Sequence, residues 1–220
     1  GVAATAALRQ IVAELQNRPT QDQVQRVVMH AVAGQLASRR LILGSRPALA
    51  PSFQPRNEME ALRRILEAGD VATVCAVQGM RGLGKSQLAS AYAQNCENLK
   101  WRFVGWVNAE GRDQLIAELA AMSRQVPELA ATDDPEEAAR GMVTWLRGID
   151  GDRLLVFDNV NHPGDLVGFV PTGPGMRVIV TTTNHSAAIG TPVEMAAFTL
   201  DEAVTYLSAR TGRCQPCWVS

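Results

Sequence analysis

The sequence predicts an α/β protein in which a parallel sheet is flanked by helices. Two observations carry this prediction. Short runs rich in apolar and β-branched residues at 71–77, 154–157 and 177–183 alternate along the chain with segments of helical pattern. A glycine-rich stretch at 79–86 lies directly between the first of these runs and a helical segment. Strands that alternate with helices in this way form a parallel sheet covered on both faces.

Residues 1–46 are predicted to form an N-terminal helical hairpin. Apolar residues recur at helical spacing from Leu8, and Pro19 ends this first helix. The second helix opens at Thr20, because a glutamine three residues later completes a capping box. It ends in three arginines, Arg39, Arg40 and Arg46. We interpret these as solvated cations at a helix C-terminus. Contact with nucleic acid is the alternative.

A proline-rich linker follows the hairpin. Its prolines, Pro47, Pro51 and Pro55, are incompatible with a continuous helix. We therefore expect two parts, a helical segment with its linker over 1–50 and a larger α/β domain over 51–220.

The stretch at 79–86 has the spacing of a phosphate-binding P-loop, a glycine and four residues followed by Gly-Lys-Ser. Glycines let the backbone turn its N–H groups toward a phosphate at φ values that a side chain would disfavour. Lys85 is expected to reach the β- and γ-phosphates, and the Ser86 hydroxyl to bind the accompanying Mg²⁺. The nucleotide-binding residues predicted here are Gly79, Met80, Arg81, Gly82, Leu83, Gly84, Lys85, Ser86 and Gln87.

The other elements follow from periodicity and capping signals. We predict helices at 58–67, 112–124, 135–148 and 199–207, and strands at 101–107, 153–158, 177–183 and 192–198. The acidic residues at 133–137 could suggest a metal site. Asp134 as N-cap and Pro135 at the first helical position explain them better as the start of a helix.

Asp158 is predicted to complete the site, because it directly follows four apolar residues at 154–157. Ligands of open α/β sheets bind at the carboxyl ends of the strands, the edge at which a P-loop also lies. We therefore expect Asp158 to hold Mg²⁺ together with Ser86. The alternative is an aspartate that merely ends a strand.

Composition argues against several classes of protein. The chain has 220 residues, of which 46% are hydrophobic and 20% charged, and a net charge of -1. This balance disfavours a broad nucleic-acid or membrane surface. With no apolar run near about 18 residues and no signal peptide, a cytoplasmic location is expected. Cys214 and Cys217 have the C-x-x-C spacing without further zinc ligands, so redox or metal chemistry there is an alternative to a plain C-terminal tail.

Three segments together resemble the NB-ARC family, the signalling STAND ATPases that include plant resistance proteins and apoptotic protease-activating factors. Residues 79–89, 154–160 and 177–184 are similar to its phosphate loop, acidic strand and sensor strand. Residues 53–58 are similar to the family's motif that meets the adenine, although the usual glycine before the arginine is missing. The resemblance adds Phe53, Arg56 and Thr183 to the expected nucleotide-binding residues.

The resemblance implies a molecular switch that is closed with ADP and that opens and oligomerises with ATP. It implies Lys85, Asp158 and Asn159 as the catalytic residues. The family usually has a second acid where this chain has Asn159, so hydrolysis is expected to be slow or absent. Thr183 likewise replaces a common sensor arginine. The chain stops before the family's helical and winged-helix subdomains, so these, sensor repeats and self-oligomerisation are expected only of a longer protein.

Two other functions compete with an ADP/ATP-binding switch. A catalytically competent ATPase or small-molecule kinase would need an acceptor pocket and an arginine-bearing lid, whereas residues 111–150 show only amphipathic helices. The second is a DNA-binding regulator in which residues 1–46 would recognise DNA, and the near-zero net charge of the chain disfavours it. The preference for adenine over guanine follows from the resemblance alone.

Overall fold

The structure is a computed structural model that describes residues 39–50, 53, 57–69, 71–76, 84–184 and 189–196, with 203, 204 and 208. The chain divides into two compact units, Gly1–Arg39 and Arg40–Ser220. The elements of the second unit are β1 (Leu41–Gly44), α3 (Asn57–Glu67), β2 (Val71–Ala76), α4 (Lys85–Asn98), β3 (Phe103–Asn108), α5 (Arg112–Ser123), α6 (Pro135–Gly148), β4 (Arg153–Val160), η2 (Pro163–Leu166), β5 (Met176–Thr182) and β6 (Thr191–Met195).

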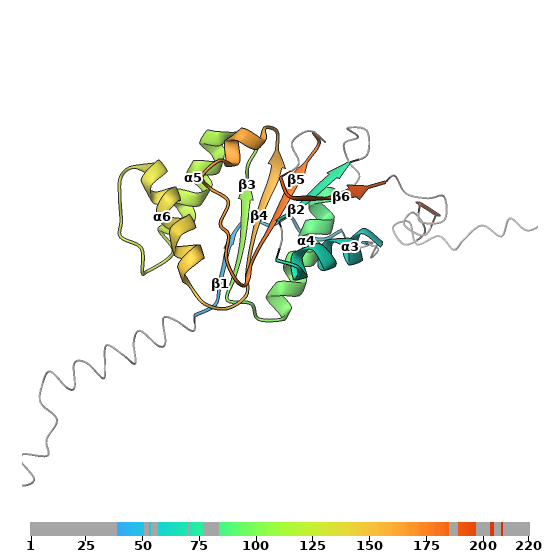
Figure 1. The fold of residues 1–220 in the computed structure, drawn as a ribbon, viewed down its shortest axis with the longest axis horizontal. Helices are drawn as coiled ribbons and strands as arrows, with labels where there is room; N and C mark the ends of the chain where they lie inside the picture. Colours follow the sequence, from blue (N-terminus) through green and yellow to red (C-terminus); the bar gives the residue numbers. More distant parts are fainter. Residues whose placement is uncertain are drawn as a thin grey trace, which may run out of the picture. The chain divides into compact units, whose positions relative to one another are not determined.

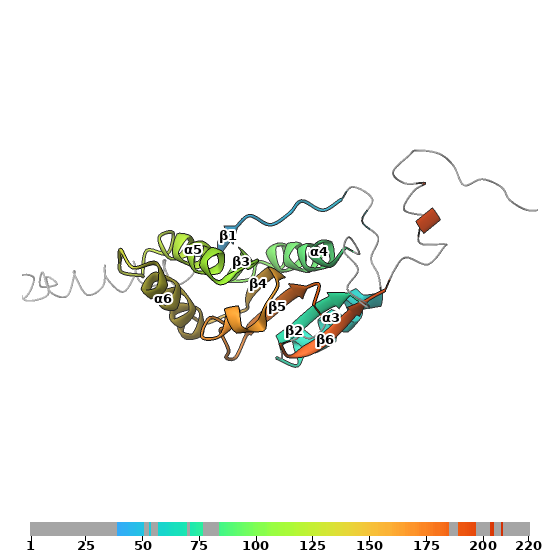
Figure 2. The ribbon, with the colours of Figure 1, turned by 90° about the horizontal axis from the view of Figure 1, so that it is seen from above.

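Six strands form one sheet in the order β1-β3-β4-β5-β2-β6, and every neighbouring pair is parallel. Figure 2 shows the strands side by side in this order. Strand β5 lies between β2 and β4, so the strand that leads to the P-loop and the strand that carries Asp158 are not neighbours. The predicted α/β fold with a parallel sheet is confirmed.

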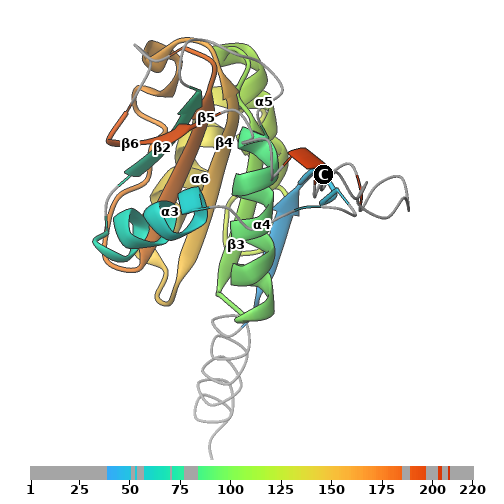
Figure 3. The same cartoon turned by 90° about the vertical axis from the view of Figure 1, so that its right-hand side faces the viewer.

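Helices cover both faces of this sheet. Figures 1 and 3 show α3 and α4 on one face and α5 and α6 on the other. The strands alternate accordingly, so that Val156 of β4 packs toward α4 and Phe157 of the same strand packs toward α5 and α6. Because successive side chains of a strand point to opposite faces, one apolar run supplies two separate cores.

The helix boundaries follow the predicted capping signals. The Asp134 carboxylate accepts hydrogen bonds from the backbone N–H groups of Glu136 and Glu137 at 2.9 and 3.4 Å, and Pro135 is the first residue of α6. The acidic residues at 133–137 therefore start a helix, as predicted. Among the helices in the described residues, none combines the length and the apolar character needed to span a lipid bilayer.

The prediction of helix up to residue 46 is wrong at its end, because Leu41–Gly44 forms strand β1. A run of three apolar residues does not distinguish helix from strand, and here the edge of β3 decides. Gly44 has a φ of +88°, and a Cβ atom added there would lie 1.9 Å from the carbonyl oxygen of Trp106. This close approach explains the glycine. The rest of the predicted hairpin lies outside the described residues.

Arg46 also differs from its prediction as a solvated cation. Its guanidinium donates to the Glu97 carboxylate at 3.0 Å and to Ser90 Oγ at 2.9 Å. Gln87 binds the same segment, because its side chain donates to Ala48 O at 3.1 Å and accepts from Ala50 N at 2.8 Å. Residues 45–50 are thus held against α4 by side chains.

Candidate functional site

Helix α4 begins at the candidate site. Its N-cap is Gly84, in the left-handed conformation with φ 87° and ψ 19°, and no side chain caps the helix within the described part of the chain. The first N–H groups of a helix have no partner within it, and the aligned peptide dipoles make this end positive. Such an end favours an anion such as a phosphate. The P-loop residues Gly79, Met80, Arg81, Gly82 and Leu83 lie outside the described residues.

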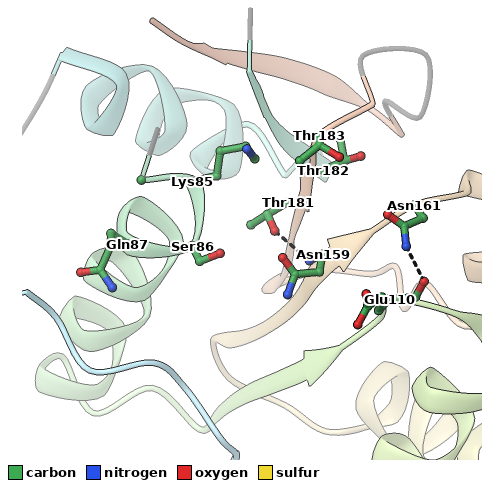
Figure 4. Close-up of a pocket in the computed structure, with 10 residues that line it drawn as sticks. Lys85, Ser86, Gln87, Glu110, Asn159, Asn161, Thr181, Thr182 and Thr183 are labelled. Atoms are coloured by element: carbon green, nitrogen blue, oxygen red, sulfur yellow. Dashed lines mark hydrogen bonds between the residues drawn. The ribbon is translucent and has the colours of Figure 1, made fainter. Parts of the chain in front are cut away.

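A cavity of about 470 Å³ opens beside this helix end (Figure 4). Its lining residues come from the start of α4 and from the ends of β3, β4 and β5; they are Gly84, Lys85, Ser86, Gln87, Glu110, Asn159, Asn161, Thr181, Thr182 and Thr183. The carboxyl ends of several parallel strands therefore meet at one cavity, which is the ligand-binding edge of open α/β sheets.

Ser86 and Asp158 are brought together, as predicted. Ser86 Oγ donates a hydrogen bond of 2.8 Å to Asp158 Oδ1. The hydroxyl of Thr181 donates to the same carboxylate oxygen. Two hydroxyl groups therefore hold the Asp158 carboxylate. Asp158 itself is only 6% exposed. Lys85 is 8% exposed and lines the cavity.

Asn159 adopts an unusual backbone conformation. The pairing of β4 with β5 shifts register between Phe157 and Val160, and Asn159 within this bulge has a φ of 64°. Asparagine is among the residues that best tolerate the left-handed region. Its backbone N–H donates to Thr181 Oγ1 at 3.0 Å, and its exposed side chain lines the cavity. The bulge therefore directs Asn159 into the site, where the amide can orient a polar ligand.

Asp158 is not among the lining residues of this cavity but lines a second, smaller cavity of about 300 Å³. This cavity is bounded by Ser45, Pro47, Trp106, Asn108, Glu118, Asp158 and Asn159. Asn108 Oδ1 is buried there without a hydrogen-bond partner among the described atoms. Asn159 therefore borders both cavities, whereas Asp158 lines the smaller one and reaches the larger one through its hydrogen bonds with Ser86 and Thr181.

Ser86 and Asp158 form a donor set that suits Mg²⁺. Magnesium prefers oxygen ligands and keeps several waters, so one or two protein oxygens and a phosphate are enough to hold it. In the described part of the chain, no three acidic, histidine or cysteine side chains gather as a metal cluster. A metal here would therefore depend on phosphate oxygens as well as on the protein.

The three nucleotide-binding residues that were named from the resemblance differ in their relation to the cavity. Thr183 lines the cavity. Phe53 is half-buried and is not among the residues that line it; its backbone N–H donates to Ala50 O at 2.9 Å. Arg56 lies outside the described residues. Gln87 lines the cavity but already bonds the backbone of residues 48 and 50.

The sequence interpretation missed Glu110 and Asn161. Asn161 Nδ2 donates to Glu110 O at 2.7 Å, which joins the ends of β3 and β4 at the cavity. A signal was present, since a carboxylate follows the apolar run at 103–107 just as Asp158 follows the next strand. To place Glu110 near Asp158, however, one must know that β3 pairs with β4, and hydrophobic periodicity does not reveal the order of strands in a sheet.

The fold and the site together define a nucleotide-binding domain of the P-loop ATPase type. The sequence profile of the NB-ARC domain matches residues 56–213. The chain therefore belongs to the NB-ARC family, and the predicted family is confirmed. No curated protein matches the chain at a significant level.

Solved structures support the same fold at low identity. The ORC2 protein of Aeropyrum pernix in its ADPNP–ADP complexes is 17% identical, with a TM-score of 0.54. The ADP form of that protein is 15% identical, with a TM-score of 0.55. Each match covers 76% of this chain and 55% of the other, so the chain spans about half the length of these proteins.

Proposed function

We propose that this chain is the ADP/ATP-binding switch module of a STAND-type signalling ATPase, with slow or no intrinsic hydrolysis. The observation that carries the proposal is the hydrogen bond between Ser86 and Asp158 at the start of α4, beside the cavity. A hydroxyl from the P-loop helix and a carboxylate from a distant strand meet where the helix end attracts phosphate.

Phosphate binding rests on Lys85 and on the backbone of the P-loop. A lysine that is 8% exposed and borders a polar cavity is well placed to interact with a polyphosphate, because burial strengthens a charge-assisted bond. We propose that residues 79–87 surround the phosphates, with Lys85 on the β- and γ-phosphates. Thr183 and the 53–56 segment complete the proposed nucleotide-binding set.

Mg²⁺ would be held by Ser86 and Asp158. When bound, the ion neutralises charge on the β- and γ-phosphates. The protein's own contribution is to keep the two oxygens in place, and Thr181 assists by donating to the Asp158 carboxylate. The 2.8 Å separation between the Ser86 hydroxyl and the Asp158 carboxylate is thus set by the packing of helix α4 beside strand β4.

The adenine preference is proposed by analogy. The Aeropyrum pernix ORC2 protein is described in complexes with ADP and ADPNP, both adenine nucleotides. The family resemblance points the same way. Within the chain, the only segment proposed to meet the base is 53–58, and that proposal comes from its resemblance to the family's adenine motif.

Slow hydrolysis is proposed because Asn159 occupies the place of a second acid. We assign Lys85, Asp158 and Asn159 to whatever hydrolysis occurs, and an amide is not a base at neutral pH. A catalytically competent ATPase is the second candidate, and the Glu110 carboxylate in the cavity favours it. The two candidates differ in turnover and not in the bound ligand.

The remaining proposals concern the domain organisation and the cellular location of the protein. We propose a helical segment and linker over 1–50, a nucleotide-binding domain over 51–220, and, in a longer protein, winged-helix and sensor domains with self-oligomerisation. We also propose a cytoplasmic location. The two described cysteines, Cys75 and Cys96, are free thiols, which fits a reducing compartment.

The test is to identify any nucleotide that the purified chain releases on denaturation and to titrate it with ADP, ATP and GTP by calorimetry in Mg²⁺. We expect bound ADP, or saturable binding of adenine nucleotides in preference to GTP. An empty protein that binds none of the three would reject the proposal. Rapid turnover of ATP would favour the second candidate.

A further inference from the structure

Glu110 is held at the nucleotide cavity by its neighbours. It follows β3, which pairs with β4 so that Asn108 lies opposite Asp158. The chain stays beside β4 past the end of the strand, because Ala109 N donates to Asp158 O at 2.7 Å. Asn161 Nδ2 then donates to Glu110 O at 2.7 Å. Two hydrogen bonds therefore fix the backbone on either side of the Glu110 side chain.

Glu110 contributes the one carboxylate to the described lining of the larger cavity, and Lys85 contributes the one cation. Figure 4 shows these two residues separated by the width of the cavity. In phosphoryl transfer the nucleophile and the leaving oxygen lie roughly in line on opposite sides of the γ-phosphorus. A base for water is therefore needed across the cavity from the P-loop, on the side where Glu110 lies.

The other polar groups are less suited to accept the proton. The Asp158 carboxylate is buried and already accepts from Ser86 and Thr181. Asn159 and Asn161 carry amides, which do not act as bases. Glu110 is exposed and lines the cavity, and among the described residues its carboxylate forms no ion pair.

We infer that Glu110 is the general base for ATP hydrolysis at this site. It would take the role of the second acid, whose position in this chain is occupied by Asn159. This inference rests on the proposed nucleotide binding and belongs to the second candidate function, a catalytically competent ATPase. The Glu110 carboxylate accepts a proton from water as the water oxygen bonds to the γ-phosphorus. The bond from the γ-phosphorus to the bridging oxygen breaks, and its electron pair leaves on ADP. The products are ADP, phosphate and the protonated glutamate, which then returns its proton to solvent.

The role predicts a split between binding and turnover. Positioned general bases contribute about 100-fold or more to a rate. Glu110→Gln keeps the size and removes the base, so turnover of bound ATP is expected to fall about 100-fold while ATP affinity changes little. A carboxylate that merely faced the phosphates would instead repel them, and its removal would tighten binding without slowing turnover.

The experiment measures single-turnover hydrolysis of ATP in Mg²⁺ and, in parallel, ATP affinity by calorimetry, for wild type and Glu110→Gln. The control is Glu128→Gln, an exposed glutamate in the loop after α5. A second variant, Glu110→Ala, is tested for rescue by sodium formate, because a small carboxylate can replace a base but not a structural contact.

The expected result is a loss of turnover in Glu110→Gln, normal turnover in Glu128→Gln and partial rescue of Glu110→Ala by formate. Unchanged turnover in Glu110→Gln would overturn the inference, as would a wild-type protein that binds ATP without hydrolysing it. Both of these outcomes leave nucleotide binding intact. Failure of wild type to bind ATP would instead remove the proposed function, and the inference with it.

Discussion

Ser86 and Asp158 are joined by a 2.8 Å hydrogen bond although 72 positions separate them in the sequence. Ser86 belongs to the first turn of α4, and Asp158 lies near the end of β4. Strand β5 lies between β4 and the strand that leads to the P-loop. Thr181 of β5 donates to the same carboxylate, so three elements meet on one oxygen atom.

Asp158→Ala tests the metal assignment. Removing the carboxylate is expected to weaken ADP binding in Mg²⁺ by about 10-fold or more, because a charged ligand of the ion is lost. Binding measured in a chelator is expected to change much less. Calorimetry in the two conditions gives the comparison, and equal losses in both would take Asp158 out of the metal site.

Thr181→Val tests the support of that carboxylate. The variant keeps the shape of the side chain but removes the donor to Asp158 and the acceptor for Asn159 N–H. We expect a loss of about 1–3 kcal/mol in the free energy of unfolding, since the buried Asp158 carboxylate loses a donor and the Asn159 N–H loses its acceptor.

The matched control for this change is Thr144→Val on the exposed face of α6. It is expected to alter stability by less than about 0.5 kcal/mol. Urea unfolding measures both variants. A similar effect of the two substitutions would show that the Thr181 hydroxyl adds little.

A pair of glycines tests the packing of the edge strand. Gly44→Ala is expected to destabilise the fold by about 2 kcal/mol or more, because its Cβ would meet the carbonyl of Trp106 at a positive φ. Gly141→Ala lies in helix α6 with open space around its Cβ, and we expect it to stabilise by about 0.5–1 kcal/mol. Thermal unfolding compares them, and a harmless Gly44→Ala would contradict the placement of β1.

Cys96 predicts a loss of stability in alkali. Burial raises the pKa of its thiol to about 12. The unfolded chain releases this proton near the ordinary thiol pKa, whereas the folded chain retains it. The contribution of Cys96 to the free energy of unfolding is therefore fully present at pH values below the ordinary thiol pKa. It is lost as the pH rises from there toward about 12.

Cys96→Ala is expected to make the decline shallower. The measurement is the free energy of unfolding by urea at a series of pH values between neutral and alkaline, for the variant and wild type. Burial also raises the pKa of Cys75, so part of the decline should remain in Cys96→Ala. Identical slopes in the two proteins would mean that Cys96 is not buried as described.

The fold and the meeting of Ser86 with Asp158 could be predicted from sequence for a physical reason. Parallel strands end at one edge, so an acid that follows one apolar run lies at the same edge of the sheet as a P-loop that follows another. Glu110 could not be assigned, because the order of strands in the sheet depends on packing between distant residues. The left-handed bulge at Asn159 is set by pairing with β5 and leaves no periodic signal. Strand β1 was missed for the same reason, since the edge of β3 selects its conformation.

Lys85→Ala tests the central claim most directly. The chain has two lysines, Lys85 in the cavity wall and Lys100 beyond the end of α4, so Lys100→Ala is a matched control. Calorimetric titration with ADP in Mg²⁺ is expected to show affinity lowered about 100-fold in Lys85→Ala, through loss of a charge-assisted bond to phosphate, and unchanged in Lys100→Ala. Equal affinity of Lys85→Ala and wild type would contradict the account.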